Sequence, residues 1–225
     1  MTTNMLARHR RRWSAFALFL ALSLCGCDDT HRRPDNETAA VVVRVRLGPT
    51  IVEAPVGEIG MIYAAKAGEP PQFDTMDEDV GLRESVRLAE RARKDGAPID
   101  AGMIRLVPEG SMEIPDFCST VQASWRCRAR RLGVERLPRF IALASTECLK
   151  GFDPSDPALR GTMLMLLDRL RPIGERPKVA CEPIQGCYAA VALGPSLAAL
   201  WRQDPDPDQA RDRAAAIRRL LEEQD

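Results

Sequence analysis

The feature that most constrains this chain is an uncharged run of twelve residues, Trp13 to Leu24, close to the N-terminus. Four arginines precede the run, and no acidic residue lies within residues 1–26. A helix needs about 20 apolar residues to cross a bilayer, so a run of this length is typical of the central region of a signal peptide. Such a segment is removed after export, and only the residues after it can contribute to the fold.

The run ends in Leu24-Cys25-Gly26-Cys27, which resembles the lipobox of bacterial lipoproteins. The resemblance covers residues 1–29 and implies cleavage before Cys27, with diacylglycerol on its sulfur and an amine that is usually acylated. Cys25 fits the modified position poorly, because Leu24 before it is too large for that box. Several acyl chains, at about 0.8 kcal/mol per buried methylene, anchor a protein stably where one chain does not.

The residues after Cys27 bear on which membrane receives the protein. In enteric-type sorting, an aspartate directly after the lipidated cysteine favours retention at the inner membrane, and Asp28 and Asp29 fit that rule. Other bacteria sort by other rules, so the outer membrane remains an alternative. We therefore expect a protein of the bacterial cell envelope that is lipid-anchored and faces the periplasm.

Loss of the signal peptide changes the charge balance. The chain has 32 basic and 32 acidic residues, and removal of the four N-terminal arginines leaves 28 against 32, a net charge of −4. A mildly acidic domain lacks the basic surface that nucleic acid or anionic lipid headgroups require. We expect the membrane, through the lipid anchor, and a protein of the envelope as partners, and no nucleic acid.

The mature chain divides into a lipidated cysteine with a flexible tether, residues 27–39, and a single globular domain, residues 40–225. The tether is polar, contains Pro34 and shows no periodicity. With 45% apolar residues, the chain can bury a core. One domain of ordinary size is therefore expected.

Alternating apolar residues predict strands, and apolar residues at helical spacing predict helices. The predicted strands are residues 41–47, 58–65, 103–107 and 139–144, and the predicted helices are residues 79–94, 120–132 and 157–171 and a last helix that starts at Asp206-Pro207. Because strands and helices interleave, we predict an α+β or α/β domain with a mixed sheet and about four helices.

Histidine is missing from the predicted domain, because His9 lies in the signal peptide and His31 in the tether. This excludes Ser–His–acid and Cys–His catalysis, and zinc or haem sites built on imidazole. No C-x-x-C pair and no common Gly-rich phosphate loop is present. We predict no catalytic residue, no metal ligand and no cofactor.

Two short motifs have a superficial likeness to functional ones. Residues 194–198 have the spacing of a nucleophile elbow, but Ser196 has no domain histidine to activate it. Residues 204–208 look like the opening of a calcium loop, but Gln209 and Ala215 stand where an EF-hand needs Gly and Glu. We interpret these as a serine near a helix start and as acids that cap the last helix.

Five cysteines remain in the domain, and in an exported protein this number predicts two disulfides and one free thiol. Cys181 and Cys187 enclose the turn-rich sequence Glu-Pro-Ile-Gln-Gly, so we predict that they form a disulfide. A short loop of this kind suits local closure, because the proline restricts the chain and the glycine permits a tight turn.

The pairing of the other cysteines depends on the predicted helix at residues 120–132. In such a helix, Cys127 lies roughly 10 Å along the axis from Cys118, at about 1.5 Å per residue, beyond the roughly 7 Å limit for a disulfide. Cys148 is then the natural partner of Cys118 or Cys127. A reactive thiol is the alternative, but no histidine or cysteine motif is available to activate it.

Residues 132–143 resemble the approach to the cis-proline strand of thioredoxin-like proteins, with Pro138 at the expected place. The resemblance covers twelve residues and implies a divergent thioredoxin-like domain. Periplasmic members of that fold occur in conjugation machinery, some of them without active cysteines. The chain departs from the pattern because no C-x-x-C precedes these residues and because a helix is predicted at residues 157–171, where a hairpin is expected.

Three functions are compatible with these features. The first is a membrane-anchored periplasmic lipoprotein that acts as a non-catalytic binding or assembly subunit of an envelope system. The second is an inhibitor or immunity-type protein against a periplasmic toxin. The third is a thioredoxin-like or other thiol enzyme whose site the sequence does not reveal. The first is favoured, because a small, acidic, tethered domain without catalytic groups suits binding.

Overall fold

The computed structural model describes residues 35–63, 82–108, 117–134, 137–159, 162–184 and 186–223. Within these ranges, seven helices and two β-sheets form an α+β fold. The same ranges contain no helix that is long and apolar enough to cross a membrane. Cys27 and Asp28 lie outside the described residues.

A six-stranded antiparallel sheet is the centre of the fold, with the strand order β3-β5-β6-β9-β8-β7. Its strands are β3 (Ile59–Tyr63), β5 (Met103–Leu106), β6 (Ile141–Ser145), β7 (Lys178–Glu182), β8 (Gly186–Ala192) and β9 (Leu197–Gln203). Side chains of β9 alternate between two separate apolar cores, with Trp201 in one and Leu200 in the other. The sheet is therefore buried on both faces.

A smaller mixed sheet lies beside it, with the order β2-β1-β4. Its strands are β1 (Val42–Leu47), β2 (Thr50–Pro55) and β4 (Ile99–Asp100). The predicted alternation along β1 is confirmed, because Val43 and Val45 are buried while Arg44 is exposed. Gly48 has a positive φ of 63° and is followed by Pro49, whose φ is necessarily negative, which fits a type II′ hairpin turn.

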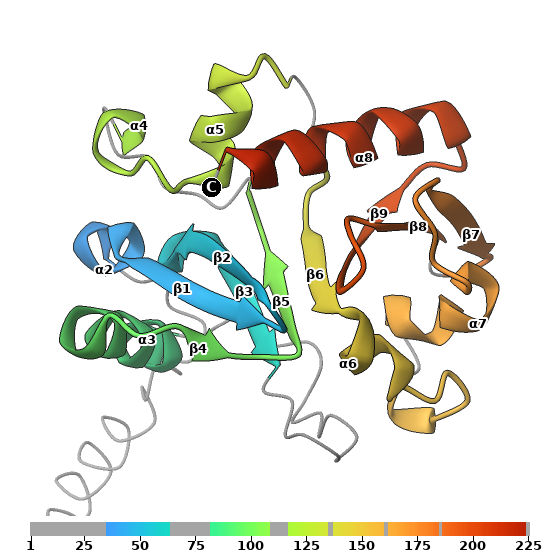
Figure 1. Ribbon diagram of the computed structural model, residues 1–225, viewed down its shortest axis with the longest axis horizontal. Coiled ribbons are helices and arrows are strands. Elements are labelled where there is room, and N and C mark those ends of the chain that lie inside the picture. The colour runs from blue at the N-terminus through green and yellow to red at the C-terminus, as the bar shows by residue number, and fades with distance from the viewer. Residues whose placement is uncertain are drawn as a thin grey trace, which may run out of the picture.

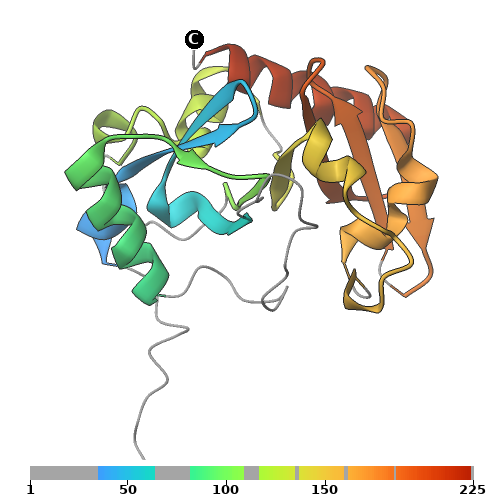
Figure 2. The ribbon, with the colours of Figure 1, turned by 60° about the horizontal axis from the view of Figure 1, so that its bottom comes forward.

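Helices cover the two faces of the large sheet (Figures 1 and 2). One face carries α6 (Thr146–Lys150), the 3₁₀ turns at Pro157–Leu159 and Met163–Leu166, and α7 (Leu167–Leu170). The other carries α5 (Trp125–Arg131), α8 (Pro207–Glu222) and the small sheet, against which α3 (Leu82–Asp95) packs. The short helices α2 (Asn36–Ala40) and α4 (Phe117–Thr120) complete the fold.

Two predicted helices differ from those in the structure. The helix expected from Thr120 begins only at Trp125, because Ser124 acts as its N-cap. The helix expected at 157–171 is divided into two 3₁₀ turns and α7, because the Thr162 hydroxyl accepts a hydrogen bond from the Leu164 amide and starts a new turn. The structure has seven helices where four were predicted, because it also contains short helices of four or five residues.

The start of the folded part also differs from the prediction. It lies before residue 40, because α2 is capped by Asp35 and buries Ala39.

The element after Ser196 differs as well, since it is the strand β9 and not a helix. Strands β8 and β9 are buried on both faces, so their sequences are continuous apolar runs without the alternation that identifies a half-exposed strand.

The start of α8 confirms the predicted cap. The Asp206 carboxylate accepts hydrogen bonds from the amides of Asp208 at 2.9 Å and Gln209 at 3.3 Å. We expect Asp206→Ala to lower the free energy of unfolding by about 1 kcal/mol, with or without calcium, because these amides lose their acceptor. Asp212→Ala, on the exposed middle of the same helix, is the matched control and should change it by less than about 0.5 kcal/mol.

Urea unfolding of both variants measures these effects. The capping interpretation is contradicted if millimolar calcium raises the melting temperature of the wild type by several degrees and leaves that of Asp206→Ala unchanged.

Candidate functional site

A buried carboxylate, Glu58, lies between the two sheets, in the 3₁₀ turn Val56–Glu58 that joins β2 to β3. Its side chain reaches the start of α5, where it accepts hydrogen bonds from Ser124 Oγ at 2.6 Å and from the amides of Trp125 at 2.7 Å and Arg126 at 3.3 Å. Burial raises the pKa of Glu58, while these three donors and the nearby Arg128 act against the rise.

A buried guanidinium, that of Arg128 in α5, extends this polar cluster. It donates to the carbonyls of Glu53 at 3.1 Å and Leu220 at 3.2 Å, and also to that of Ala123. The Cζ atom of Arg128 lies 5.8 Å from the centre of the Trp125 ring, within the range of a cation–π contact. The cluster therefore ties α5 to β2 and to the end of α8.

The chemistry of this cluster fits a structural role. Glu58 and Arg128 have exposed fractions of 1% and 2%, and the partners named above are the Ser124 hydroxyl and main-chain groups. A buried charge needs such partners to offset its loss of hydration. We interpret Glu58 as the acceptor for the first amides of α5, beside the Ser124 cap, and not as an acid or base for a substrate.

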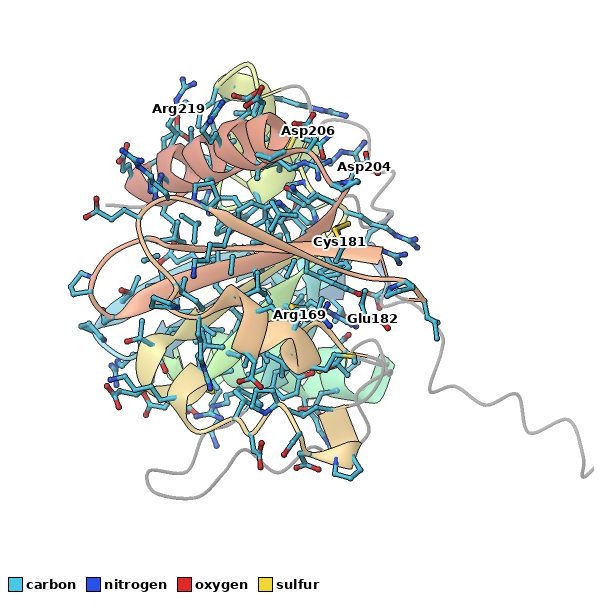
Figure 3. All side chains as sticks on the ribbon, turned by 90° about the vertical axis from the view of Figure 1, so that its right-hand side faces the viewer. Arg169, Cys181, Glu182, Asp204, Asp206 and Arg219 are labelled. Atoms are coloured by element: carbon cyan, nitrogen blue, oxygen red, sulfur yellow. A yellow bond between two sulfur atoms is a disulfide. The ribbon has the colours of Figure 1, made fainter. Side chains whose placement is uncertain are left out.

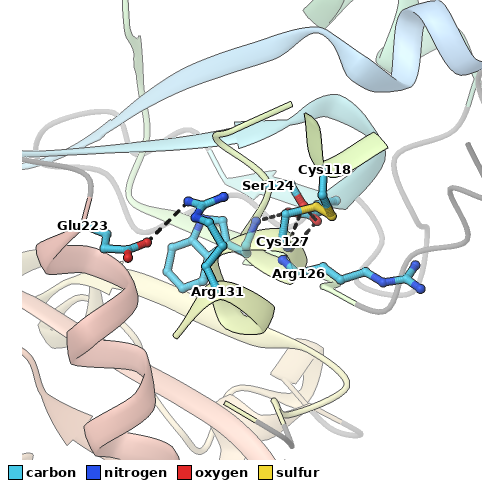
Figure 4. The surroundings of a disulfide bond; sticks show 8 residues. Cys118, Ser124, Arg126, Cys127, Arg131 and Glu223 are labelled. Atoms are coloured by element: carbon cyan, nitrogen blue, oxygen red, sulfur yellow. Dashed lines mark hydrogen bonds and ion pairs between the residues drawn. A yellow bond between two sulfur atoms is a disulfide. The ribbon is translucent and has the colours of Figure 1, made fainter. Parts of the chain in front are cut away.

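The disulfide next to this cluster corrects the predicted pairing. Cys118 of α4 is bonded to Cys127 of α5, with 5.3 Å between their α-carbons (Figure 4), so the predicted pairing of Cys148 with either one is wrong. The prediction assumed one helix over residues 120–132. Because the helix starts at Trp125, the chain between the two cysteines turns back, and they come within bonding distance.

The free thiol among the described cysteines is Cys148, in α6. It is 7% exposed and packs in the core on the α6–α7 side of the large sheet. Burial raises the pKa of Cys148 to about 11. A thiol with this pKa is protonated at neutral pH, so it is a poor nucleophile and a poor metal ligand.

The predicted disulfide between Cys181 and Cys187 is present in the structure, and these residues face each other across the β7–β8 pair. Arg169 Nη1 donates to the Cys181 carbonyl at 2.8 Å. At the tip of the hairpin, the Ile184 amide donates to Glu182 Oε2 at 2.9 Å. Figure 3 shows Arg169, Cys181 and Glu182 on the same side of the molecule.

Two of the depressions on the described surface are bordered by charged side chains. The first, of about 540 Å³, is bordered by Glu175, Arg176 and the turn after β8, and Arg218 beside it donates to the carbonyls of Glu175 and Ala192. The second, of about 670 Å³, follows α8 next to Gly133. No group of three or more His, Cys, Asp or Glu side chains that could hold a metal ion occurs among the described residues.

The two short motifs with a likeness to functional ones, residues 194–198 and 204–208, have structural roles in the fold. Ser196 lies in the turn between β8 and β9, and its carbonyl accepts from the Thr146 amide at 2.9 Å. Residues 204–208 lead into α8, with Asp206 as the cap. The Glu58 cluster has no signal in the sequence, because its members are far apart along the chain: 66 residues separate Glu58 from Ser124.

Comparison with protein-family models, with curated proteins and with solved structures found no match. The functional interpretation therefore depends on the residues and contacts of this chain.

We expect Ser124→Ala to lower the free energy of unfolding by about 1–3 kcal/mol, because the change removes a donor to the buried Glu58 carboxylate and the acceptor of the Cys127 amide. Ser196→Ala, at a half-buried serine outside the cluster, is the matched control and should change it by less than about 0.5 kcal/mol. Chemical denaturation measures both. Equal effects of the two substitutions would contradict a particular contribution of the Glu58 cluster to the free energy of unfolding.

Proposed function

We propose that this protein is a lipid-anchored component of the bacterial cell envelope that faces the periplasm and acts as a non-catalytic binding or assembly subunit. The observation that carries the proposal is the order of the N-terminal features: four arginines, the uncharged run from Trp13 to Leu24, and then Gly26-Cys27. Asp28 favours the inner membrane, and the outer membrane is the alternative.

The cysteines of the folded part support export. Four of the five domain cysteines form two disulfides, Cys118–Cys127 and Cys181–Cys187. Disulfides of this kind persist in oxidising compartments such as the periplasm, and they are rare in the cytosol, where thiols are kept reduced. The two disulfides are thus compatible with the periplasmic localisation that the N-terminal sequence predicts.

The environment of the charged and nucleophilic groups supports a binding role over a catalytic one. Glu58 and Arg128 use their hydrogen bonds inside the fold, and the Cys148 thiol is buried with a raised pKa. A thiol enzyme needs an exposed thiol with a lowered pKa, so this alternative has little support. An inhibitor or immunity-type protein is a special case of the binding role, in which the partner is a toxin.

The anchor is tested by substitution of the cysteine that would carry it. We expect Cys27→Ser to abolish incorporation of radiolabelled fatty acid and to release the protein from the membrane fraction, because the acceptor sulfur is lost. Cys25→Ser is the matched control, and it should leave both the label and the membrane association unchanged. Equal label on Cys27→Ser and on the wild type would contradict the proposal.

The binding role is tested with the anchored, full-length protein. Affinity purification from membranes, followed by mass spectrometry, should recover an envelope protein in an amount comparable to the bait. Recovery of the bait alone, after mild crosslinking in intact cells, would count against a binding subunit.

A further inference from the structure

The described cysteines differ in how far they reach the surface. Cys181 is exposed, and its disulfide partner Cys187 is 7% exposed. Cys118 is half-buried, and its partner Cys127 is 1% exposed. A thiol that attacks a disulfide must reach one of its two sulfurs. The Cys181 half of the Cys181–Cys187 bond is therefore the most accessible target among the described disulfides.

The Cys118–Cys127 disulfide is covered by apolar side chains. Cys127 and Val121 form a small buried cluster, against which Cys118 and Val42 pack. The Cys127 amide also donates to Ser124 Oγ at 3.2 Å, which holds this cysteine in the first turn of α5. A thiol can enter this region only if α4 or α5 is displaced. The bond thus provides an internal comparison for the exposed one.

The charged groups beside the β7–β8 hairpin favour an anionic sulfur at Cys181. Arg169 Nη1 donates to the Cys181 carbonyl at 2.8 Å, and the two residues lie on the same side of the molecule (Figure 3). Arg202 Nη2 lies 3.4 Å from the place where a β-carbon on Gly186 would stand. The carboxylate of the adjacent Glu182 opposes these two guanidinium groups. Positive charge beside a cysteine stabilises its thiolate and attracts an anionic thiol.

The strands that carry this disulfide have other contacts that hold them in the sheet. β7 and β8 pair over five positions, and β8 and β9 over six. Ala180 of β7 and Tyr188 of β8 are buried in the core on the α6–α7 side. Because these contacts do not depend on the disulfide, we expect the hairpin to stay in place when the bond opens.

We propose that Cys181 is a thiol-exchange site: the thiolate of an envelope thiol attacks its sulfur and forms a mixed disulfide there. The attacking group is the thiol of a small molecule, such as glutathione, or of a thiol–disulfide oxidoreductase. The inference rests on the proposed location in the periplasm and adds a modification site to the proposed function.

The exchange needs no other reactant. The attacking sulfur forms a bond with Cys181 Sγ, the Cys181–Cys187 bond breaks, and Cys187 leaves as a thiolate that takes a proton from water. The attacking thiol is thereby oxidised and Cys187 is reduced. In the reverse step, the Cys187 thiolate attacks Cys181 Sγ, expels the thiol and restores the disulfide.

The site is tested first on purified, oxidised, full-length wild-type protein in detergent. The protein is incubated with reduced glutathione under native conditions, quenched at intervals with an alkylating reagent and mapped without reduction. We expect glutathione on Cys181 and the alkyl group on Cys187, and the Cys118–Cys127 bond should open at least about tenfold more slowly. Glutathione on Cys187 in place of Cys181, or equal rates for the two bonds, would overturn the proposal.

Arg169→Gln tests the contribution of charge. We expect exchange with glutathione to slow by about threefold, because a cation beside the anionic sulfurs is lost. The effect should be smaller with β-mercaptoethanol, which has no carboxylates. Arg91→Gln, at an exposed arginine of α3, is the matched control and should leave both rates unchanged. Equal rates for the two variants would contradict the contribution of Arg169.

The source of the thiol is identified in cells of the native host. Cys187→Ser removes the sulfur that expels an attached thiol, so a mixed disulfide at Cys181 should persist. Cys181→Ser leaves the buried Cys187 and is the matched control, which we expect to give about one-fifth as much adduct or less. A protein adduct identifies an oxidoreductase, and a glutathione adduct identifies the small thiol. In Cys187→Ser, a free Cys181 or a link from it to Cys148 would overturn the proposal.

The two proposals fail in different ways. If protein alkylated directly in cells has all five domain thiols reduced, export to an oxidising compartment is contradicted, and protein oxidised after purification still tests the exchange site. If glutathione opens neither disulfide of the wild-type protein, the exchange site is overturned and the lipid anchor and the binding role stand. This second result requires no variant, so it holds even if Cys187→Ser does not fold.

Discussion

The Glu58 carboxylate lies where the chain passes from the small sheet to the large one. It accepts hydrogen bonds from the start of α5, although Ser124 is 66 positions further along the chain. Arg128 of the same helix donates hydrogen bonds to carbonyls of β2 and of the end of α8. Together these contacts fix α5 against the turn between the two sheets, against β2 and against the end of α8. Each group is costly to bury alone, so the cluster holds only when all of its members are in place.

The same contacts explain where sequence reasoning succeeded and where it did not. The alternation along β1 and the Asp-Pro start of α8 are local signals, and the structure confirms both. The helix start predicted at Thr120 also depends on local sequence, but Ser124 caps the helix instead, and its hydroxyl also bonds the distant Glu58. The wrong helix start then produced the wrong pairing for Cys118 and Cys127.

Burial explains the other differences. The strands β8 and β9 have apolar side chains on both faces, so their sequences lack the alternation that marks a half-exposed strand. Helices of four or five residues, such as α4 and α6, are shorter than the window over which helical spacing can be recognised. The Cys181–Cys187 disulfide was predictable because only five residues separate the two cysteines, so its loop depends on local sequence.

Two local disulfides, one beside the Glu58 cluster and one in the β7–β8 hairpin, stabilise the fold, and the free thiol among the described residues, Cys148, is buried. Peptide mapping without reduction, on protein isolated from cells, tests this most directly. The account predicts links between Cys118 and Cys127 and between Cys181 and Cys187, with Cys148 alkylated only after denaturation. A link from Cys148 to another cysteine, or alkylation of all five domain cysteines without reduction, would contradict it.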